Sequence, residues 1–320
     1  MNGHVLQVEN LKVYYPTSSG PIKAVDGVSF NLNAGEKLGL VGESGCGKST
    51  LALSLLRLIK PPGRIEGGRI LLNGVDLTKL SWEEMRRIRL NQISLIPQGA
   101  MNSLNPVMRV KNQIMDGMRA HNPGMSHQEL EARVYETLEL VGLERNVASM
   151  YPHELSGGMK QRVCVAIAIS LRPQVVVADE PTSALDVVVQ RQVMETIGQL
   201  QEELGAAVIL IGHDMGLMAQ FVERLAVMYA GRLVEVGNVR EVFRRPLHPY
   251  TQLLISSVPL LGEKGAFRSI PGLTPSLLNV PPGCNFHPRC PQAQDICSKE
   301  VPPLVEVSPN RWVACHQGEV

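Results

Sequence analysis

Hydrophobic residues in the first three quarters of the chain alternate between short apolar runs and longer segments with helical spacing. Three of the short runs have the character of buried strands of a parallel sheet, at residues 37–41, 175–178 and 208–211. Two longer segments, residues 49–59 and 187–204, have the composition of helices, and Gly205 follows the second. Strands and helices that alternate up to about residue 245 predict an α/β fold with a parallel sheet.

A further helix is expected between Ser126 and about Leu140. Ser126 and Glu129 have the spacing of a capping box, in which the serine hydroxyl and the glutamate carboxylate each accept a hydrogen bond from the other residue's backbone. Gly142 suits the C-terminal end of the same helix.

The composition changes after Arg245. Residues 246–320 contain 12 of the 22 prolines and four of the six cysteines. Proline at this density prevents long helices and central strands, so we expect a separate, loop-rich region that is stabilised by something other than a large core. The predicted domains are therefore residues 1–245 and 246–320.

Charge and hydropathy exclude several classes of protein. Lys plus Arg is 31 and Asp plus Glu is 30, which offers no basic excess for binding nucleic acid. The apolar runs are much shorter than the roughly 18–20 residues of a membrane-spanning helix, and residues 1–9 lack the pattern of a secretory signal. We expect a cytosolic protein whose membrane role, if it has one, depends on a partner.

Residues 42–49 match the phosphate-binding loop pattern GxxxxGK[ST]. Glycines allow the backbone N–H groups to approach phosphates closely, and the following helix directs its positive N-terminal end at the same anion. Lys48 is expected to reach the β- and γ-phosphates of a bound nucleotide such as ATP, and the Ser49 hydroxyl to bind Mg²⁺. The expected nucleotide-binding positions of this segment are Gly42, Ser44, Gly45, Gly47, Lys48, Ser49 and Thr50.

Two later strands deliver polar side chains at their carboxyl ends, where ligands bind in sheets of this kind. Asp179 and Glu180 follow the run at residues 175–178. Asp179 fits a second contact to Mg²⁺, and Glu180 fits the base that polarises the attacking water. His213 follows residues 208–211 and could contact the γ-phosphate, although a single histidine is more often structural.

One segment distinguishes among the many classes of P-loop enzyme, namely Leu155-Ser156-Gly157-Gly158-Met159. It resembles the LSGGQ signature of the ABC ATPase family, with methionine in place of the usual glutamine. A Ser-Gly-Gly sequence before a helix is suited to hold an anion. In the family, Ser156, Gly157 and Gly158 would close over the ATP that is bound to a second subunit, so that two ATP molecules lie between two ATPase domains.

The resemblance extends from residue 5 to about residue 245 and implies a RecA-like P-loop core with a β-subdomain and an inserted helical subdomain, about residues 99–172. It implies that Gln98 contacts Mg²⁺ and moves with the nucleotide state. Asp186, in Ser183-Ala184-Leu185-Asp186, would bridge the two ATPase subunits. Tyr15 is expected to stack on adenine, with Tyr14 as the alternative, and either could instead pack in the N-terminal sheet.

The C-terminal region resembles the extension of ATPases from oligopeptide and dipeptide importers. The resemblance rests on His248-Pro249-Tyr250-Thr251-Gln252 and on Phe286-His287-Pro288-Arg289-Cys290-Pro291. It implies two permease subunits, a second and different ATPase, an extracytoplasmic solute-binding protein, and a peripheral position on the cytoplasmic face of the inner membrane. Relatives with the same extension import nickel chelates or other small solutes, so this alternative stays open.

Four cysteines of this region have the spacing C-x₅-C-x₆-C-x₁₇-C, at Cys284, Cys290, Cys297 and Cys315. Four thiolates suit zinc or an iron–sulfur cluster. Zinc sites usually have closely spaced cysteine pairs, whereas loose spacing suits a larger cluster. The resembled extension can hold a [4Fe–4S] cluster, which favours the same choice. Zinc and plain thiols or disulfides are the alternatives, and a structural role is expected before a redox-sensing one.

The sequence disfavours two functions other than a transport ATPase. A soluble ABC ATPase of DNA repair or translation typically has long coiled coils or two fused ATPase domains, whereas this sequence has no heptad run and one P-loop. A catalytically inactive subunit is disfavoured because Lys48, Asp179, Glu180 and His213 are all present.

Overall fold

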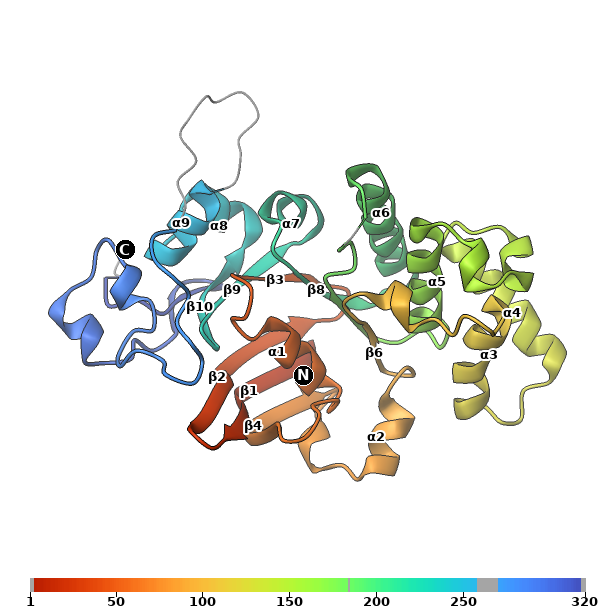
Figure 1. Ribbon diagram of the computed structural model, residues 1–320, viewed down its shortest axis with the longest axis horizontal. Coiled ribbons are helices and arrows are strands. Elements are labelled where there is room, and N and C mark those ends of the chain that lie inside the picture. The colour runs from red at the N-terminus through yellow and green to blue at the C-terminus, as the bar shows by residue number, and fades with distance from the viewer. Residues whose placement is uncertain (1–2, 184, 258–269, 318–320) are drawn as a thin grey trace. The chain divides into compact units, whose positions relative to one another are not determined.

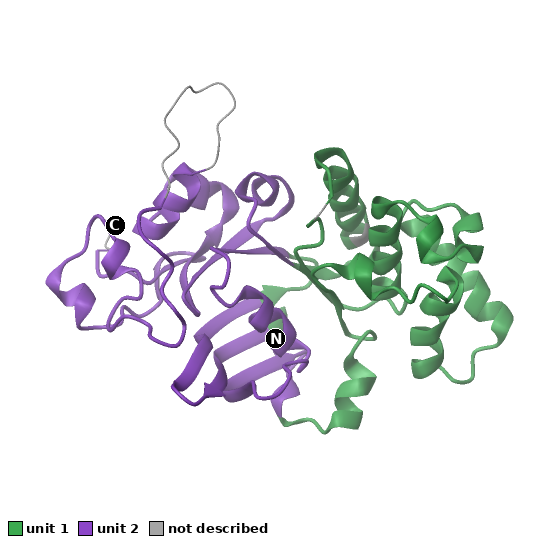
Figure 2. Ribbon diagram, viewed as in Figure 1, with its two compact units in different colours: residues 1–6, 32–36, 79–209 green, residues 7–31, 37–78, 210–320 purple. Residues whose placement is uncertain are grey.

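A computed structural model describes residues 3–183, 185–257 and 270–317. Ala184, part of the predicted bridging loop, therefore lies outside the described residues. The chain forms two compact units (Figure 2). Unit 1 comprises Met1–Leu6, Leu32–Glu36 and Lys79–Ile209, and unit 2 comprises Gln7–Asn31, Lys37–Thr78 and Leu210–Val320.

Most residues of a four-stranded sheet belong to unit 2. Its strand order is β2-β1-β4-β5, with bounds β1 His4–Thr17, β2 Gly20–Asn33, β4 Arg64–Leu72 and β5 Val75–Asp76. In β1 the buried positions change from even numbers, Leu6 and Val8, to odd numbers, Leu11 and Val13. Asn10 lies between them with φ 45°, and this local irregularity keeps the apolar side chains on one face.

Unit 2 also contains strands that flank the phosphate loop. Strand β3 (Lys37–Val41) pairs in parallel with β9 (Arg224–Tyr229), and β9 pairs antiparallel with β10 (Arg232–Asn238). The apolar run of β3 is buried, as its sequence predicts. Four helices of this unit are α1 Lys48–Leu55, α7 Met215–Phe221, α8 Val239–Arg244 and α9 Pro249–Ser256. The 3₁₀ turn η1 (Leu77–Lys79) begins in this unit and ends in unit 1.

Helix α1 ends earlier than its sequence pattern predicts. The apolar pattern continues to Ile59, but the helix stops at Leu55. Arg57 has φ 51°, which a right-handed helix cannot accommodate, and its guanidinium donates a hydrogen bond to the Leu77 carbonyl at 3.1 Å. The predicted helix end was therefore wrong. The helix ends in a Schellman motif, in which the Arg57 N–H donates to the Ser54 carbonyl at 2.9 Å and the Leu58 N–H to the Leu53 carbonyl at 2.8 Å.

Unit 1 contains the parallel pair β6 (Ile93–Ile96) and β7 (Val175–Asp179). Strand β8 (Ala207–Gly212) begins in this unit and continues along the chain into unit 2. Helices α3, α4 and α5 form the helical part of the unit (Figure 1). Its helices and 3₁₀ turns are α2 Trp82–Ile88, α3 Val110–His121, α4 His127–Leu140, α5 Gly157–Ile169, α6 Val187–Leu204, η2 Ala100–Ser103, η3 Arg145–Ser149 and η4 Pro152–Glu154.

Two helix predictions in unit 1 are confirmed. Helix α4 has the predicted capping box between Ser126 and Glu129, with both reciprocal hydrogen bonds present. Helix α6 has the predicted bounds and ends at Gly205, whose φ of 63° is the left-handed conformation that glycine adopts without strain.

The C-terminal extension contributes two short strands to unit 2. Strand β12 (Arg311–Val313) pairs antiparallel with β10 and with β11 (Val305–Ser308). The remaining elements are the 3₁₀ turns η5 His287–Arg289 and η6 Asp295–Ser298, so the described part of the extension is rich in loops, as predicted. Across all described residues, no helix is long and apolar enough to cross a lipid bilayer.

Candidate nucleotide-binding site

The phosphate loop of unit 2 has a backbone that only glycine permits at two positions. Gly42 has φ 153°, and a Cβ atom there would lie 2.1 Å from the Met228 carbonyl oxygen. Gly47 has φ 109°, and its Cβ would lie 2.0 Å from the Ala24 carbonyl oxygen. Strands β2 and β9 thus press directly on the loop, and any side chain at either glycine would change the loop's shape.

Lys48 lies at the start of α1 with its side chain folded over the loop. Its Nζ donates hydrogen bonds to the Gly42 carbonyl at 2.8 Å and to the Glu43 carbonyl at 3.0 Å. Helix α1 has Gly47 at its N-cap and no side chain that caps it. The N–H groups of its first turn, which includes Ser49 and Thr50, are therefore available to an anion.

Unit 1 contains Glu180, the predicted base, and Gln98, one of its predicted neighbours. Glu180 directly follows β7, and its Oε2 accepts a hydrogen bond from Gln98 Nε2 at 2.8 Å. Asp179, the last residue of β7, is 4% exposed. Glu180 has φ 47°, a conformation that costs a non-glycine residue roughly 1–2 kcal/mol. A non-glycine residue in such a strained backbone conformation is typical of a functional site.

The signature segment forms the N-terminus of α5. The Ser156 hydroxyl accepts a hydrogen bond from the Met159 N–H at 3.3 Å and so caps the helix. A Cβ on Gly158 would lie 2.6 Å from Val189 Cγ1 of α6, so the contact between α5 and α6 requires glycine there. Asp186 caps α6 by accepting hydrogen bonds from the Val188 and Val189 N–H groups, at 3.1 and 3.0 Å.

The two candidate adenine-stacking tyrosines differ in their contacts within β1. The Tyr14 hydroxyl donates to Asp26 Oδ1 at 2.6 Å, and Asp26 also forms an ion pair with Arg232 at 2.6 Å. Burial and the hydrogen bond to Asp26 raise the pKa of Tyr14 well above its usual value. Tyr14 is therefore held in its sheet by this hydrogen bond, while the Tyr15 ring lies beside Gly63, where a Cβ atom would be 2.4 Å from it. His213 is exposed just after β8, in unit 2.

The four cysteines of the extension line one small cavity. The Cys284 N–H donates to the Cys297 carbonyl at 2.8 Å, and none of the described cysteines forms a disulfide. Burial, together with the neighbouring thiols, raises the pKa of Cys284 to about 11. Within the described ranges, no three Cys, His, Asp or Glu side chains are placed to hold a single metal ion.

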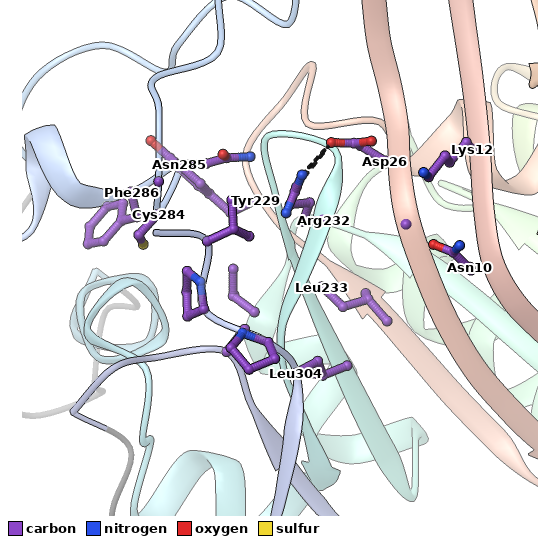
Figure 3. Close-up of a pocket in the computed structure, with 17 residues that line it drawn as sticks. Asn10, Lys12, Asp26, Tyr229, Arg232, Leu233, Cys284, Asn285, Phe286 and Leu304 are labelled. Atoms are coloured by element: carbon purple, nitrogen blue, oxygen red, sulfur yellow. Dashed lines mark hydrogen bonds and ion pairs between the residues drawn. The ribbon is translucent and has the colours of Figure 1, made fainter. Parts of the chain in front are cut away.

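A second cavity, of about 290 Å³, lies in unit 2 between the β1–β2 strands and the extension. Figure 3 shows Asp26 and Arg232 joined on one side of it, with Cys284, Asn285 and Phe286 of the extension near Tyr229. The extension therefore packs against the core on which the phosphate loop is built.

Sequence reasoning missed the residues that connect the extension to the phosphate loop. Glu43 occupies a position that the P-loop pattern leaves free, and Arg289 lies 246 residues further along the chain, yet the two form an ion pair at 2.7 Å. No periodicity relates residues so far apart in sequence, so only the fold could identify the pair.

Comparison with known proteins identifies the family. Residues 25–183 match the family described as ABC transporter, and residues 234–297 match the C-terminal region of oligopeptide/dipeptide transporters. The oligopeptide transport ATP-binding protein OppD of Salmonella typhimurium is 46% identical over 314 residues, which cover 97% of this chain and 93% of that protein. The chain belongs to the ABC transporter family. The dipeptide transport ATP-binding protein DppD of Caldanaerobacter subterraneus subsp. tengcongensis is 42% identical over 314 residues, covering 98% of this chain and 96% of that one.

Solved structures of the family share the fold. The dimeric ABC transporter cassette MJ0796 has a TM-score of 0.66 and 29% identity, covering 73% of this chain and 99% of that one. The cassette CbiO1 from Clostridium perfringens has a TM-score of 0.64 and 29% identity, covering 76% of this chain and 92% of that one. The predicted α/β fold is thereby confirmed as that of an ABC ATPase cassette.

Proposed function

We propose that this chain is the ATP-binding and ATP-hydrolysing subunit of an ABC importer for dipeptides or oligopeptides. The observation that carries the proposal is a complete phosphate loop and a Glu180–Gln98 pair in a chain whose C-terminal region matches oligopeptide/dipeptide transporters. OppD and DppD, which resemble the chain over nearly its whole length, are named as peptide transport ATP-binding proteins.

Each site residue has a role in hydrolysis. Lys48 and the loop N–H groups bind the β- and γ-phosphates, and Tyr15 stacks on the adenine. Glu180, oriented by Gln98, polarises the attacking water, and His213 contacts the γ-phosphate. The oxygens of Ser49, Gln98 and Asp179 are the kind that Mg²⁺ prefers, and the ion would neutralise charge on the phosphates.

The signature segment acts on the partner's nucleotide. Ser156, Gly157 and Gly158 present the start of α5 to the ATP of a second ATPase subunit, and Asp186 bridges the two subunits. Dimeric MJ0796 supports this arrangement, and a further MJ0796 structure in a post-hydrolysis state, with ADP and Pi bound, is 28% identical with a TM-score of 0.66. The second ATPase is a related but different chain.

The four-cysteine site holds a [4Fe–4S] cluster. Its support is that the four thiols line one cavity. A cluster takes each thiolate on a different iron, so it needs a wider spacing than zinc does. Zinc is the alternative. The bound group would stabilise a proline-rich segment with little core of its own.

The proposed importer function also requires membrane and extracytoplasmic partners. The chain lies peripherally on the cytoplasmic face of the inner membrane and contacts two permease subunits through the helical part of unit 1. A solute-binding protein delivers peptide from outside. ATP binding closes the ATPase dimer, and hydrolysis with product release reopens it.

Nucleotide binding and partner capture test this function together. Lys48→Ala should weaken ATP binding because it removes a charge from the phosphate site, whereas Lys60→Ala, a change at an exposed lysine, should leave binding unchanged. Tagged chain should co-purify with two membrane permeases, and peptide uptake should require it. Co-purification with ribosomes or DNA, or uptake of nickel chelates in place of peptides, would contradict the proposal.

A further inference from the structure

Glu43, the second residue of the phosphate loop, is held on three sides by the C-terminal extension. Arg289 binds its carboxylate with two nitrogens, at 2.7 Å to Oε2 and 3.0 Å to Oε1. The Thr274 hydroxyl donates to the same carboxylate at 3.1 Å. The Glu43 N–H donates to the Tyr250 hydroxyl at 2.9 Å. Backbone and side chain of this one loop residue are therefore both fixed from the extension.

Arg289 is itself rigidly placed. Its side chain is 6% exposed, and its Nε donates to the Pro271 carbonyl at 2.7 Å. A second guanidinium hydrogen bond reaches the Tyr229 hydroxyl on β9 at 3.2 Å. The rings of Tyr229, Tyr250 and Phe286 pack together with centroid distances of 4.6 to 5.4 Å. Since this cluster is buried, Arg289 has little freedom to follow Glu43 if the loop moves.

A second connection reaches the other end of the loop. Asn285 Nδ2 donates to the Ala230 carbonyl at 2.9 Å, and the next residue, Gly231, donates its N–H to the Cys46 carbonyl at 2.9 Å. Asn285 and Phe286 lie beside Tyr229 in Figure 3. The extension thus contacts both Glu43 and, through the β9–β10 turn, Cys46.

The position of Glu43 matters to the phosphate site. Its carbonyl oxygen accepts a hydrogen bond from Lys48 Nζ at 3.0 Å and another from the Cys46 N–H at 3.3 Å. A carboxylate in a phosphate-binding loop would repel the triphosphate unless a cation neutralised it. Arg289 supplies that cation and fixes the carboxylate in a bidentate geometry.

We propose that Arg289 is a positioning residue for ATP binding, through which the C-terminal extension holds the phosphate loop in its nucleotide-binding form and neutralises Glu43. The inference rests on the proposed ATPase function. It assigns to the extension a direct effect on nucleotide affinity, in addition to any part in partner recognition or in holding a metal centre.

The decisive experiment is a double-mutant cycle on nucleotide binding in the full chain. Arg289→Gln should weaken binding of a non-hydrolysable ATP analogue about 5- to 20-fold, the lower part of the roughly 5- to 150-fold range typical of coupled sites, while kcat at saturating ATP changes less than KM. Arg289→Gln combined with Glu43→Gln should recover most of the affinity, because the unpaired carboxylate is gone. The deficit of Arg289→Gln should also shrink as salt increases.

Two controls separate this effect from simple destabilisation. Arg64→Gln removes an exposed arginine that pairs with Glu66 in the same unit, and it should leave affinity unchanged. Arg289→Lys keeps the positive charge but loses the planar guanidinium that binds the carboxylate with two hydrogen bonds. The nucleotide affinity of this variant should therefore lie between those of the parent and Arg289→Gln. Folded Arg289→Gln that binds nucleotide as tightly as the parent would overturn the inference alone, whereas a parent that binds no nucleotide would overturn the proposed function as well.

Hydrogen exchange gives an independent readout if Arg289→Gln folds poorly. If the phosphate loop binds nucleotide more tightly when the extension is docked, then by linkage bound nucleotide must also stabilise the docking of the extension. In the parent, the analogue should slow exchange of the Cys284 N–H, which is bonded to the Cys297 carbonyl at 2.8 Å. Unchanged exchange across residues 284–297 on saturation with the analogue would refute the coupling.

Discussion

Replacing Glu180 with glutamine isolates the basicity of the proposed catalytic carboxylate. The Gln98 Nε2 atom donates to Glu180 Oε2 at 2.8 Å, and the amide oxygen of a glutamine can accept the same bond. Both side chains have the same size and branching, so the strained backbone at φ 47° costs about the same with either. The substitution therefore leaves geometry in place and removes the negative charge that polarises water.

The expected loss follows from the role of a general base. Such a group typically contributes roughly 10²- to 10⁴-fold to the rate, which corresponds to about 2.7–5.4 kcal/mol of the activation barrier. ATP affinity should stay within about threefold of the parent, because Lys48 and the loop glycines are unchanged. The closed, ATP-bound dimer should accumulate, since binding continues and reopening by hydrolysis does not.

Phosphate release at saturating MgATP measures turnover, and size-exclusion chromatography with ATP measures the dimer. The matched control is Glu195→Gln on α6, where the carboxylate forms an exposed ion pair with Arg191 at 2.9 Å. This control should hydrolyse ATP at the parent rate. Turnover of Glu180→Gln within a few-fold of the parent would show that another group acts as the base.

Three further predictions concern the fold and the extension. Arg311→Met should lower the free energy of unfolding by about 3 kcal/mol, because it leaves the fully buried Glu235 carboxylate without its cation. Denaturant titrations measure this change, and a loss below about 1 kcal/mol would contradict the prediction. Gly158→Ala should lower the free energy of unfolding by about 1–3 kcal/mol, because the added Cβ would lie 2.6 Å from Val189 Cγ1. Adding Val189→Ala should restore most of this stability, and an unchanged melting temperature in the single variant would argue against the contact. Anaerobically purified chain should be brown with about four irons, whereas colourless protein with one zinc would show that the metal was wrongly chosen.

Much of the fold could be predicted because its signals are local. Helix α6 has the predicted bounds, since its spacing, its Asp186 cap and Gly205 all lie within or beside it. The end of α1 could not be predicted in the same way. The apolar pattern continues past Leu55, and the left-handed residue of the Schellman motif that ends the helix is Arg57, where glycine is the usual residue. A glycine or asparagine at that position would have marked the helix end in the sequence, whereas an arginine gives no such signal.

Only part of the candidate site could be predicted from the sequence. The phosphate loop is readable because strand, glycines and helix are contiguous, and the steric limits at Gly42 and Gly47 agree with the motif. Glu43 is different, since the motif permits any residue there. From sequence alone, its carboxylate looks unfavourable for binding a triphosphate.

The fold resolves that conflict through a residue of the extension. Arg289 follows a proline in a region that sequence composition marks only as rich in loops and cysteines, and η5 brings its guanidinium to Glu43. Because the arginine is buried among Tyr229 and Phe286, the charge of the loop and the docking of the extension cannot change independently. A substitution that loosens the extension should therefore appear first as weaker nucleotide binding, even when every residue of the phosphate loop is intact.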